Sequence, residues 1–319
     1  MEPKIARLIP DAMALNKRAL GRLVSVFEDI RPEAAELRER VLSEIEKRGP
    51  SRRGRFLGFT GSPGAGKSTL IGRIGVGMVS GDPDVRVAMV AVDPSSRVSG
   101  GAFLGDRTRV RFPTREKRLF FRSQAADLEL GGVSRSTFQV SRLLHRLFDY
   151  VFIETVGIGQ SEIEVQYVAD RIYLVLQPMA GDEIQFMKAG IMEIPDIFVL
   201  NKCDESEEAE RSYYALRTSL SYARPNEGEE PRIVKASALT GLGIDELITD
   251  IVSLSDSGTR HTMEEKEGYF FEKWVRDEYG RAGLKGFHYR HSTGLDYIRE
   301  AGSFERAQRA FADGFREPE

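Results

Sequence analysis

The sequence predicts an α/β fold in which a mostly parallel central sheet lies between two layers of helices. Between residues 56 and 254, short apolar runs alternate with stretches of helical periodicity, which is the pattern of parallel strands joined by helices. Several of these runs are almost wholly apolar, as expected for strands covered on both faces. With hydrophobic residues at 41% of 319, the chain can also build a sizeable core.

The elements of this region follow from the same pattern. Right-handed crossovers would bring the C-terminal ends of the strands to one edge of the sheet, where a ligand is expected. The predicted strands are 56–60, 85–92, 119–122, 150–155, 172–176, 197–200 and 232–236. The predicted helices are 66–79, 136–147, 183–192, 205–220 and 244–254.

Helical segments are predicted on both sides of the α/β region. In the N-terminal segment apolar residues recur at helical spacing, and Pro10 and Pro32 are expected to break it into separate helices. In the C-terminal segment Phe270 and Trp274 share a helical face, which we expect to fold back on the core rather than to meet a partner. The predicted division is an N-terminal helical arm at 1–52, the α/β domain at 53–255 and a C-terminal helical extension at 256–319.

Charge and cysteine content exclude several classes of protein. Lysine and arginine total 46 against 49 acidic residues, so the chain lacks the basic footprint of a nucleic-acid-binding protein. The single cysteine, Cys203, excludes a disulfide framework and fits a reducing compartment. The N-terminus carries no apolar signal segment, and no apolar run is long enough to cross a membrane. We therefore expect a soluble, cytoplasmic protein.

The stretch 61–69, GSPGAGKST, predicts a phosphate-binding loop. It matches G-x-x-x-x-G-K-S-T between an apolar run and a helical stretch, so a chance glycine-rich turn is a poor alternative. Its glycines allow successive backbone N–H groups to point at an anion. Lys67 would reach the β- and γ-phosphates, and the Ser68 hydroxyl would bind Mg²⁺. The predicted nucleotide-binding residues here are Gly61, Ser62, Gly64, Ala65, Gly66, Lys67, Ser68 and Thr69.

A second motif indicates that the base is guanine. Asn201-Lys202-Cys203-Asp204 follows an apolar strand and matches the N-K-x-D loop of GTPases. The Asp204 carboxylate would accept two hydrogen bonds from guanine that adenine cannot offer. Asn201 would hold the loop, and the stem of Lys202 would lie over the base. After another strand, Ser237, Ala238 and Leu239 match the loop that supports the guanine oxygen. An ATPase is the less favoured alternative.

Three carboxylates are candidates for the metal side of the site. Glu154 follows an apolar strand in the sequence E-T-V-G, where related GTPases have D-x-x-G. It is the carboxylate best placed to hold Mg²⁺, which takes few protein ligands and keeps several waters. Asp93 ends another strand, and Asp106 lies in the long loop that follows. The alternatives are that Asp93 only caps a turn and that Asp106 is a solvated loop residue.

With these loops in place, the chain resembles the ArgK/MeaB family of SIMIBI-class P-loop GTPases. The stretches that carry the resemblance are VDPSS at 92–96, GGAFLGDRTR at 100–109, LGGVSR at 130–135, ETVGIGQSE at 154–162, GDEIQ at 181–185 and KAG at 188–190. The resemblance implies a chaperone of adenosylcobalamin-dependent acyl-CoA mutases such as methylmalonyl-CoA mutase. Such proteins use GTP binding and hydrolysis to gate cofactor loading and to protect the mutase. They are homodimers to which the C-terminal extension contributes.

The resemblance also implies roles for single residues. Asp93, Asp106 and Glu154 would form a metal-binding and water-activating cluster beside Ser68. Gln185 and Lys188 would belong to a mobile loop near the nucleotide, where Lys188 brings positive charge to the phosphates. The alternative for Lys188 is a surface lysine on a helix. The implied catalytic residues are Lys67, Asp93, Asp106, Glu154, Gln185 and Lys188.

Other functions stay open at this point. A nickel metallochaperone of hydrogenase or urease maturation is disfavoured because Cys203 is alone and the four histidines are scattered. A kinase of transport proteins is disfavoured by the guanine motif. A scaffold that binds nucleotide without hydrolysing it is a further alternative. We expect slow basal hydrolysis, since no arginine finger can be placed, and we expect cobalamin to bind the partner because a D-x-H-x-x-G signature is absent from this chain.

Overall fold

The computed structural model describes residues 3–29, 31–49, 52–93, 115–125, 133–155, 164–178, 191–204, 206–223, 232–254 and 259–316. The chain forms two compact units. The helical unit comprises Met1–Gly54, Ser134–Leu147 and His261–Glu319, and the sheet unit comprises Arg55–Val133 and Phe148–Arg260. The three-part division predicted above stays a prediction. In the described ranges no helix has the length and apolar character needed to cross a bilayer.

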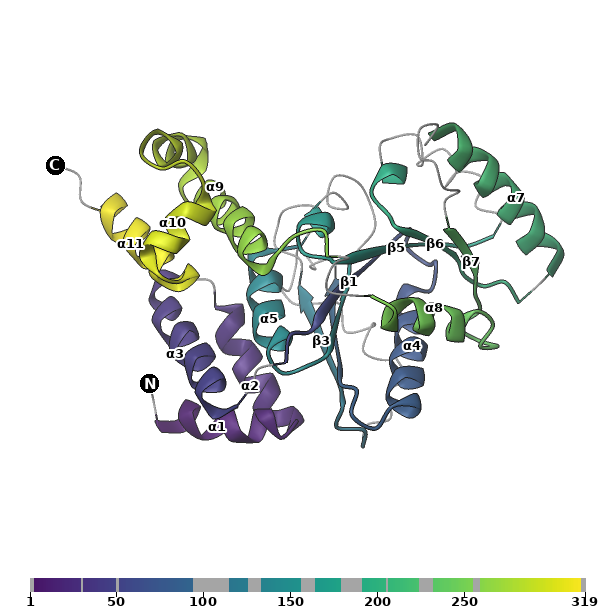
Figure 1. Cartoon of the computed structure of the whole chain (residues 1–319), viewed down its shortest axis with the longest axis horizontal. Helices are drawn as coiled ribbons and strands as arrows, with labels where there is room; N and C mark the ends of the chain where they lie inside the picture. The colour runs from purple at the N-terminus through teal and green to yellow at the C-terminus, as the bar shows by residue number, and fades with distance from the viewer. Residues whose placement is uncertain are drawn as a thin grey trace. The chain divides into compact units, whose positions relative to one another are not determined.

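Parallel strands form the centre of the sheet unit. Among the described residues there are seven, in the order β3-β2-β4-β1-β5-β6-β7, and every neighbouring pair is parallel. This arrangement, with helices on both faces, confirms the predicted α/β fold (Figure 1). The strands are β1 (Arg55–Thr60), β2 (Val87–Asp93), β3 (Leu119–Ala125), β4 (Tyr150–Glu154), β5 (Arg171–Leu176), β6 (Ile197–Leu200) and β7 (Arg232–Lys235).

The two faces of the sheet pack against different helices. Side chains such as Phe59 and Tyr173, whose rings stack with centroids 4.9 Å apart, join a core with α4 (Lys67–Gly81) and α8 (Ile244–Val252). The alternate residues of β5 and β6 join a second core with α7 (Ser206–Ala223). Successive strand residues point to opposite faces, so both faces are apolar and both are covered.

The ends of the predicted elements differ from the structure by up to three residues. Strand β3, for example, continues to Ala125 because it pairs along its full length with β2. The predicted helix at 183–192 falls mostly outside the described residues, and its described end belongs to a 3₁₀ turn, η4 (Ile191–Glu193). Another 3₁₀ turn, η3 (Glu164–Tyr167), precedes β5.

The helical unit is built from segments far apart in the sequence. Helix α11 near the C-terminus packs on α3 near the N-terminus, and α2 and α9 both contact α5 (Figure 1). The helices are α1 (Pro3–Met13), α2 (Lys17–Glu28), α3 (Pro32–Arg48), α5 (Arg135–His145), α9 (Met263–Arg290), α10 (Gly294–Ala301) and α11 (Phe304–Arg316).

The prediction that Pro10 breaks the N-terminal segment is wrong. Pro10 lies inside α1, and the break comes later, where Leu15 adopts a left-handed conformation with φ of 61°. The side chain of Asn16 then caps α2 by accepting hydrogen bonds from two backbone N–H groups, which starts a new helix. Pro32 stands at the first position of α3, where proline needs no N–H partner.

The aromatic helix near the C-terminus folds back within the helical unit, as predicted. Phe270, Phe271 and Trp274 are all at most 2% exposed. Helix α9 continues past a kink at Gly280, which has φ of 69°. Helix α10 was not predicted. It is capped by Thr293, a short local signal that no long apolar pattern accompanies.

Candidate nucleotide-binding site

The glycine-rich loop joins β1 to α4, as the sequence predicted. Gly61 has φ of +133°, and a Cβ atom there would lie 2.0 Å from the main-chain oxygen of Val175. Gly66 has φ of +84°, and its Cβ would lie 2.6 Å from the side-chain nitrogen of Asn201. Gly64 is also left-handed, with φ of +86°. Glycine is therefore required for conformation at these positions and for space at 61 and 66.

Lys67 places positive charge within this loop. It is the first residue of α4, and its side chain is buried. Its Nζ donates to the main-chain oxygens of Gly61 at 2.7 Å and Ser62 at 3.0 Å. The start of α4 adds the positive end of the helix dipole, with Thr69 in its first turn. The loop thus has the charge and the backbone geometry of a phosphate-binding site.

Ser68 and Glu154, two of the residues expected to hold Mg²⁺, lie together. The Ser68 hydroxyl donates to a carboxylate oxygen of Glu154 at 2.7 Å. Glu154 ends β4, opposite Phe59 of β1, so the strand pairing brings it to the glycine-rich loop. Both side chains offer hard oxygen ligands, which Mg²⁺ prefers. In the described ranges no three His, Cys, Asp or Glu side chains are close enough to hold a metal ion.

The other predicted catalytic residues are only partly described. Asp93 is the last residue of β2, whose Ala91 pairs with Glu154, so its backbone lies at the same edge of the sheet. Asp106, Gln185 and Lys188 fall outside the described residues. Their places in the site stay predictions.

Asn201 joins the base loop to the phosphate loop. It follows β6, is 1% exposed, and its amide nitrogen donates to the main-chain oxygen of Ala65 at 2.8 Å. Its amide oxygen accepts from the backbone N–H of Ala238 at 3.2 Å. One side chain therefore connects three loops that are distant in the sequence. This geometry accounts for the role expected of Asn201 and shows that it reaches further than its own loop.

The groups expected to contact guanine lie in two loops, 201–204 and 237–239, that are joined by a hydrogen bond. The hydroxyl of Ser237 donates to the Asp204 carboxylate, and it accepts from the backbone N–H of Thr240 at 2.9 Å. The Asp204 carboxylate is thereby oriented by a neighbouring loop. The side chain of Leu239 is 80% exposed.

Lys202 has a partner that the sequence analysis missed. Its Nζ donates to the side-chain oxygen of Gln177 at 2.7 Å, across 25 positions of sequence. Gln177 directly follows β5, the neighbour of β6 in the sheet. Lys202 itself has φ of 63°, an unusual conformation for a side-chain-bearing residue. No local motif links Gln177 to the base loop, so this contact could be predicted only by someone who knew that β5 and β6 are neighbours in the sheet.

Cys203 is packed beneath the base loop. Its thiol donates to the main-chain oxygen of Leu200 at 3.0 Å, and its N–H donates to that of Ala236 at 3.0 Å. Burial raises the pKa of the thiol, which makes it a poor nucleophile at neutral pH. Its part in the site is therefore to hold the loop.

A parallel α/β sheet that carries a glycine-rich phosphate loop, a Ser–Glu pair and an N-K-x-D loop at one edge defines a P-loop GTPase. Comparison with known families agrees. Residues 20–278 match the family described as methylmalonyl-CoA mutase-associated GTPase MeaB, and the chain belongs to this family. It is accordingly a guanine-nucleotide-binding GTPase.

Individual relatives also support membership of this GTPase family. A protein of Caulobacter vibrioides named as a GTPase is 39% identical over 243 residues, covering 75% of this chain and 73% of that protein. A mitochondrial protein of Caenorhabditis briggsae, named methylmalonic aciduria type A homolog, is 30% identical over 295 residues, covering 87% of this chain and 71% of that protein. A homolog of the same name from Caenorhabditis elegans is also 30% identical.

Solved structures support the fold. A structure titled LAO/AO transport system kinase covers 99% of both chains with a TM-score of 0.64 at 23% identity. HypB of Helicobacter pylori in complex with nickel covers 74% of this chain and 99% of that one, with a TM-score of 0.51 at 18% identity. At such identities the likeness concerns the fold alone.

Proposed function

We propose that this GTPase gates the loading of adenosylcobalamin into a cobalamin-dependent acyl-CoA mutase of the methylmalonyl-CoA mutase type, and that it protects this mutase. Family membership carries the proposal, since the family is described by its association with that mutase. The mitochondrial relatives, named for methylmalonic aciduria, support the same client.

The chemistry of the switch is GTP hydrolysis with Mg²⁺. Ser68 and Glu154 would hold the ion, with Asp93 and Asp106 as further carboxylates of the cluster. The fit rests on the Ser68–Glu154 contact of 2.7 Å at the start of α4. When bound, Mg²⁺ neutralises charge that develops on the β- and γ-phosphates. Lys67 would move from its main-chain acceptors to these phosphates and contribute a second positive charge.

The rate of hydrolysis would depend on a positive charge that reaches the phosphates only in one state of the protein. Lys188, which the resemblance assigns to the same loop as Gln185, is the candidate. Slow basal turnover would follow as long as this positive charge is not supplied to the phosphates. A partner or a second copy of the chain could then raise the rate by bringing that charge into place, an effect that reaches ~10³ to 10⁵ in GTPases. We further propose a homodimer in which the C-terminal extension takes part.

Transfer of the cofactor tests the proposal. Apo-mutase is mixed with adenosylcobalamin and this protein, and uptake is followed by the visible absorbance of the cofactor. We expect that GTP and a non-hydrolysable analogue change the extent or rate of uptake differently, and that the difference is lost in Lys67→Ala. Uptake that is the same with GTP, with the analogue and without nucleotide would contradict the gating role while leaving the GTPase assignment intact.

A further inference from the structure

The side chain of Lys202 follows a defined path, although Lys202 is an exposed residue. At its tip, the Nζ donates to the side-chain oxygen of Gln177 at 2.7 Å. At its other end, the backbone of Lys202 is left-handed, with φ of 63°. Between these points the Cε atom passes the phosphate loop, 3.8 Å from the place that a Cβ atom of Gly66 would take. The stem therefore runs from the base loop past the phosphate loop to the end of β5.

The acceptor for Lys202 stands on backbone that the sheet holds in place. Gln177 directly follows Leu176, the last residue of β5, and Leu176 pairs with Leu200 of the neighbouring strand β6. The main-chain oxygen of Leu176 also accepts from the N–H of Asn201 at 2.8 Å. The backbone beside Gln177 is thus joined directly to the base loop that carries Lys202.

The left-handed backbone of Lys202 indicates that its side chain has a function. Glycine adopts this conformation freely, whereas a residue with a Cβ atom is strained in it. Strain of this kind persists where the surroundings impose it, and it gathers at ligand-binding sites. A lysine at position 202 is therefore explained better by a ligand that uses its side chain than by a hydrogen bond on the protein surface alone.

We propose that Gln177 is a positioning residue of the nucleotide-binding site, which holds the ammonium group of Lys202 so that the methylenes of this side chain lie across the face of the guanine base. This role rests on the contact with the base that the N-K-x-D motif predicts for Lys202. A lysine without an anchor loses the freedom of several rotatable bonds when a ligand orders it. A lysine that is already held in place loses less, and a preorganised site binds its ligand more tightly.

The binding of GDP and of inosine diphosphate to the full chain tests the inference. Gln177→Ala should weaken GDP binding by roughly 2- to 10-fold, as expected for the loss of one hydrogen bond, and mainly through faster dissociation. Inosine diphosphate lacks the amino group that Asp204 is expected to bind. It should nevertheless lose the same factor, because the lysine stem would contact the face of the base. Gln177→Glu keeps an oxygen acceptor and should bind GDP more tightly than Gln177→Ala.

A double-mutant cycle separates positioning from a general structural effect. In a Lys202→Ala background, Gln177→Ala should change GDP affinity no further, because the two side chains act through one contact. A role of Gln177 in holding the sheet together would persist in that background. Arg211→Ala removes an exposed ion pair of α7, and this matched control should bind GDP like the wild type.

Three results would overturn the inference. Unchanged GDP affinity in Gln177→Ala would show that Lys202 needs no anchor, and if Lys202→Ala were also unchanged, the predicted contact with the base would fail too. Equal losses from Gln177→Ala with and without Lys202 would show that Gln177 acts independently of the lysine. A loss that differs between GDP and inosine diphosphate would show that Gln177 acts on the amino-group contact instead. None of these results bears on cofactor loading, which the transfer experiment tests separately.

Discussion

The side-chain amide of Asn201 donates to the main-chain oxygen of Ala65 at 2.8 Å, although the two residues lie 136 positions apart. The contact fixes the base-binding loop against the phosphate-binding loop. It also explains why residue 66 must be glycine, since a Cβ there would strike the same amide. The loops expected to bind the phosphates and the base are therefore joined directly by Asn201.

Replacing Asn201 by alanine should weaken the binding of GTP and of GDP to the same extent. The change leaves the buried Ala65 oxygen and the Ala238 N–H without their partner, at about 1–3 kcal/mol. We expect an affinity loss of about 5- to 150-fold for both nucleotides, measured with fluorescent guanine nucleotides. Tyr222→Ala, at an 82% exposed position of α7, is the control. Unchanged GDP affinity in Asn201→Ala would show that the bridge is dispensable.

Two glycines of the phosphate loop should differ in their tolerance of alanine. Gly64 has left-handed φ but nothing within 4 Å of its Cβ position. Gly64→Ala should therefore lower the free energy of unfolding only by the cost of a left-handed backbone at alanine, about 1–2 kcal/mol. At Gly61 the added Cβ meets the Val175 backbone, and overpacking adds about 1–3 kcal/mol. Chemical denaturation of both variants compares the costs. Equal free energies of unfolding would contradict the tight packing at residue 61.

Glu154→Gln should separate catalysis from nucleotide binding. Glutamine can still accept from Ser68 but carries no charge for Mg²⁺. Since a catalytic metal supplies several kcal/mol, we expect kcat to fall by ~100-fold and the Mg²⁺ requirement to rise, with GDP affinity in EDTA unchanged. Glu207→Gln, on the exposed surface of α7, should leave both unchanged. A normal kcat at saturating Mg²⁺ would show that Glu154 does not hold the catalytic metal ion.

Glu305 should make the stability of the protein depend on acid pH. Burial by itself would raise the pKa of Glu305, but the charge and hydrogen bonds of Arg142 outweigh it and lower the pKa. A lowered pKa in the folded state contributes stability that is present above the unfolded value, near 4.5, and is lost as pH falls through the folded value.

The variant Glu305→Gln isolates this contribution. At pH 7 it leaves Arg142 with less compensation, and we expect a loss of about 3–5 kcal/mol in the free energy of unfolding. Below pH 4.5 the difference from the wild type should narrow, because the Glu305 carboxylate of the unfolded wild type takes up a proton there while the folded one stays charged beside Arg142. Urea denaturation at pH 7 and at pH 4 provides the comparison. A difference that stays constant across this range would mean that the ion pair does not control stability.

Much of the sheet unit could be predicted from local sequence. The apolar strands and the loop GSPGAGKST are contiguous, so their chemistry is visible in a short window. Ser68 meets Glu154 because Glu154 ends β4, and the glycine-rich loop that leads to Ser68 follows the neighbouring strand β1. Gln177 could not be found in this way. Its contact with Lys202 depends on the order of β5 and β6 and on no local pattern.

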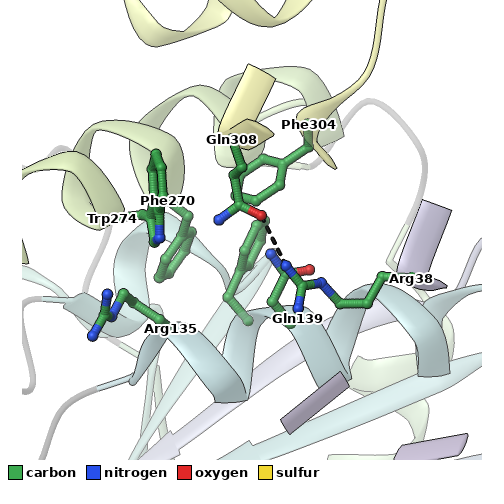
Figure 2. A pocket seen from close by; sticks show the side chains of 8 residues that line it. Arg38, Arg135, Gln139, Phe270, Trp274, Phe304 and Gln308 are labelled. Carbon is green, nitrogen blue, oxygen red and sulfur yellow. Dashed lines mark hydrogen bonds between the residues drawn. The ribbon is translucent and has the colours of Figure 1, made fainter. Parts of the chain in front are cut away.

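The helical unit was harder to predict for a related reason. Its contacts join segments from opposite ends of the chain, as between Arg38 and Gln308, which are 270 positions apart (Figure 2). Pro10 was misread because proline lacks only one donor and its effect on a short helix depends on neighbouring packing. The true break at Leu15 is set by a backbone conformation that side-chain periodicity does not encode.

The most direct measurement is steady-state GTP hydrolysis by the full chain, alone and with a cobalamin-dependent acyl-CoA mutase from the same source. The account predicts slow turnover alone, acceleration by the mutase, and loss of that acceleration in Lys188→Ala while the affinity for GDP is kept. Turnover of tens per second by the isolated protein would contradict the switch. The absence of any change with the mutase would contradict the proposed client.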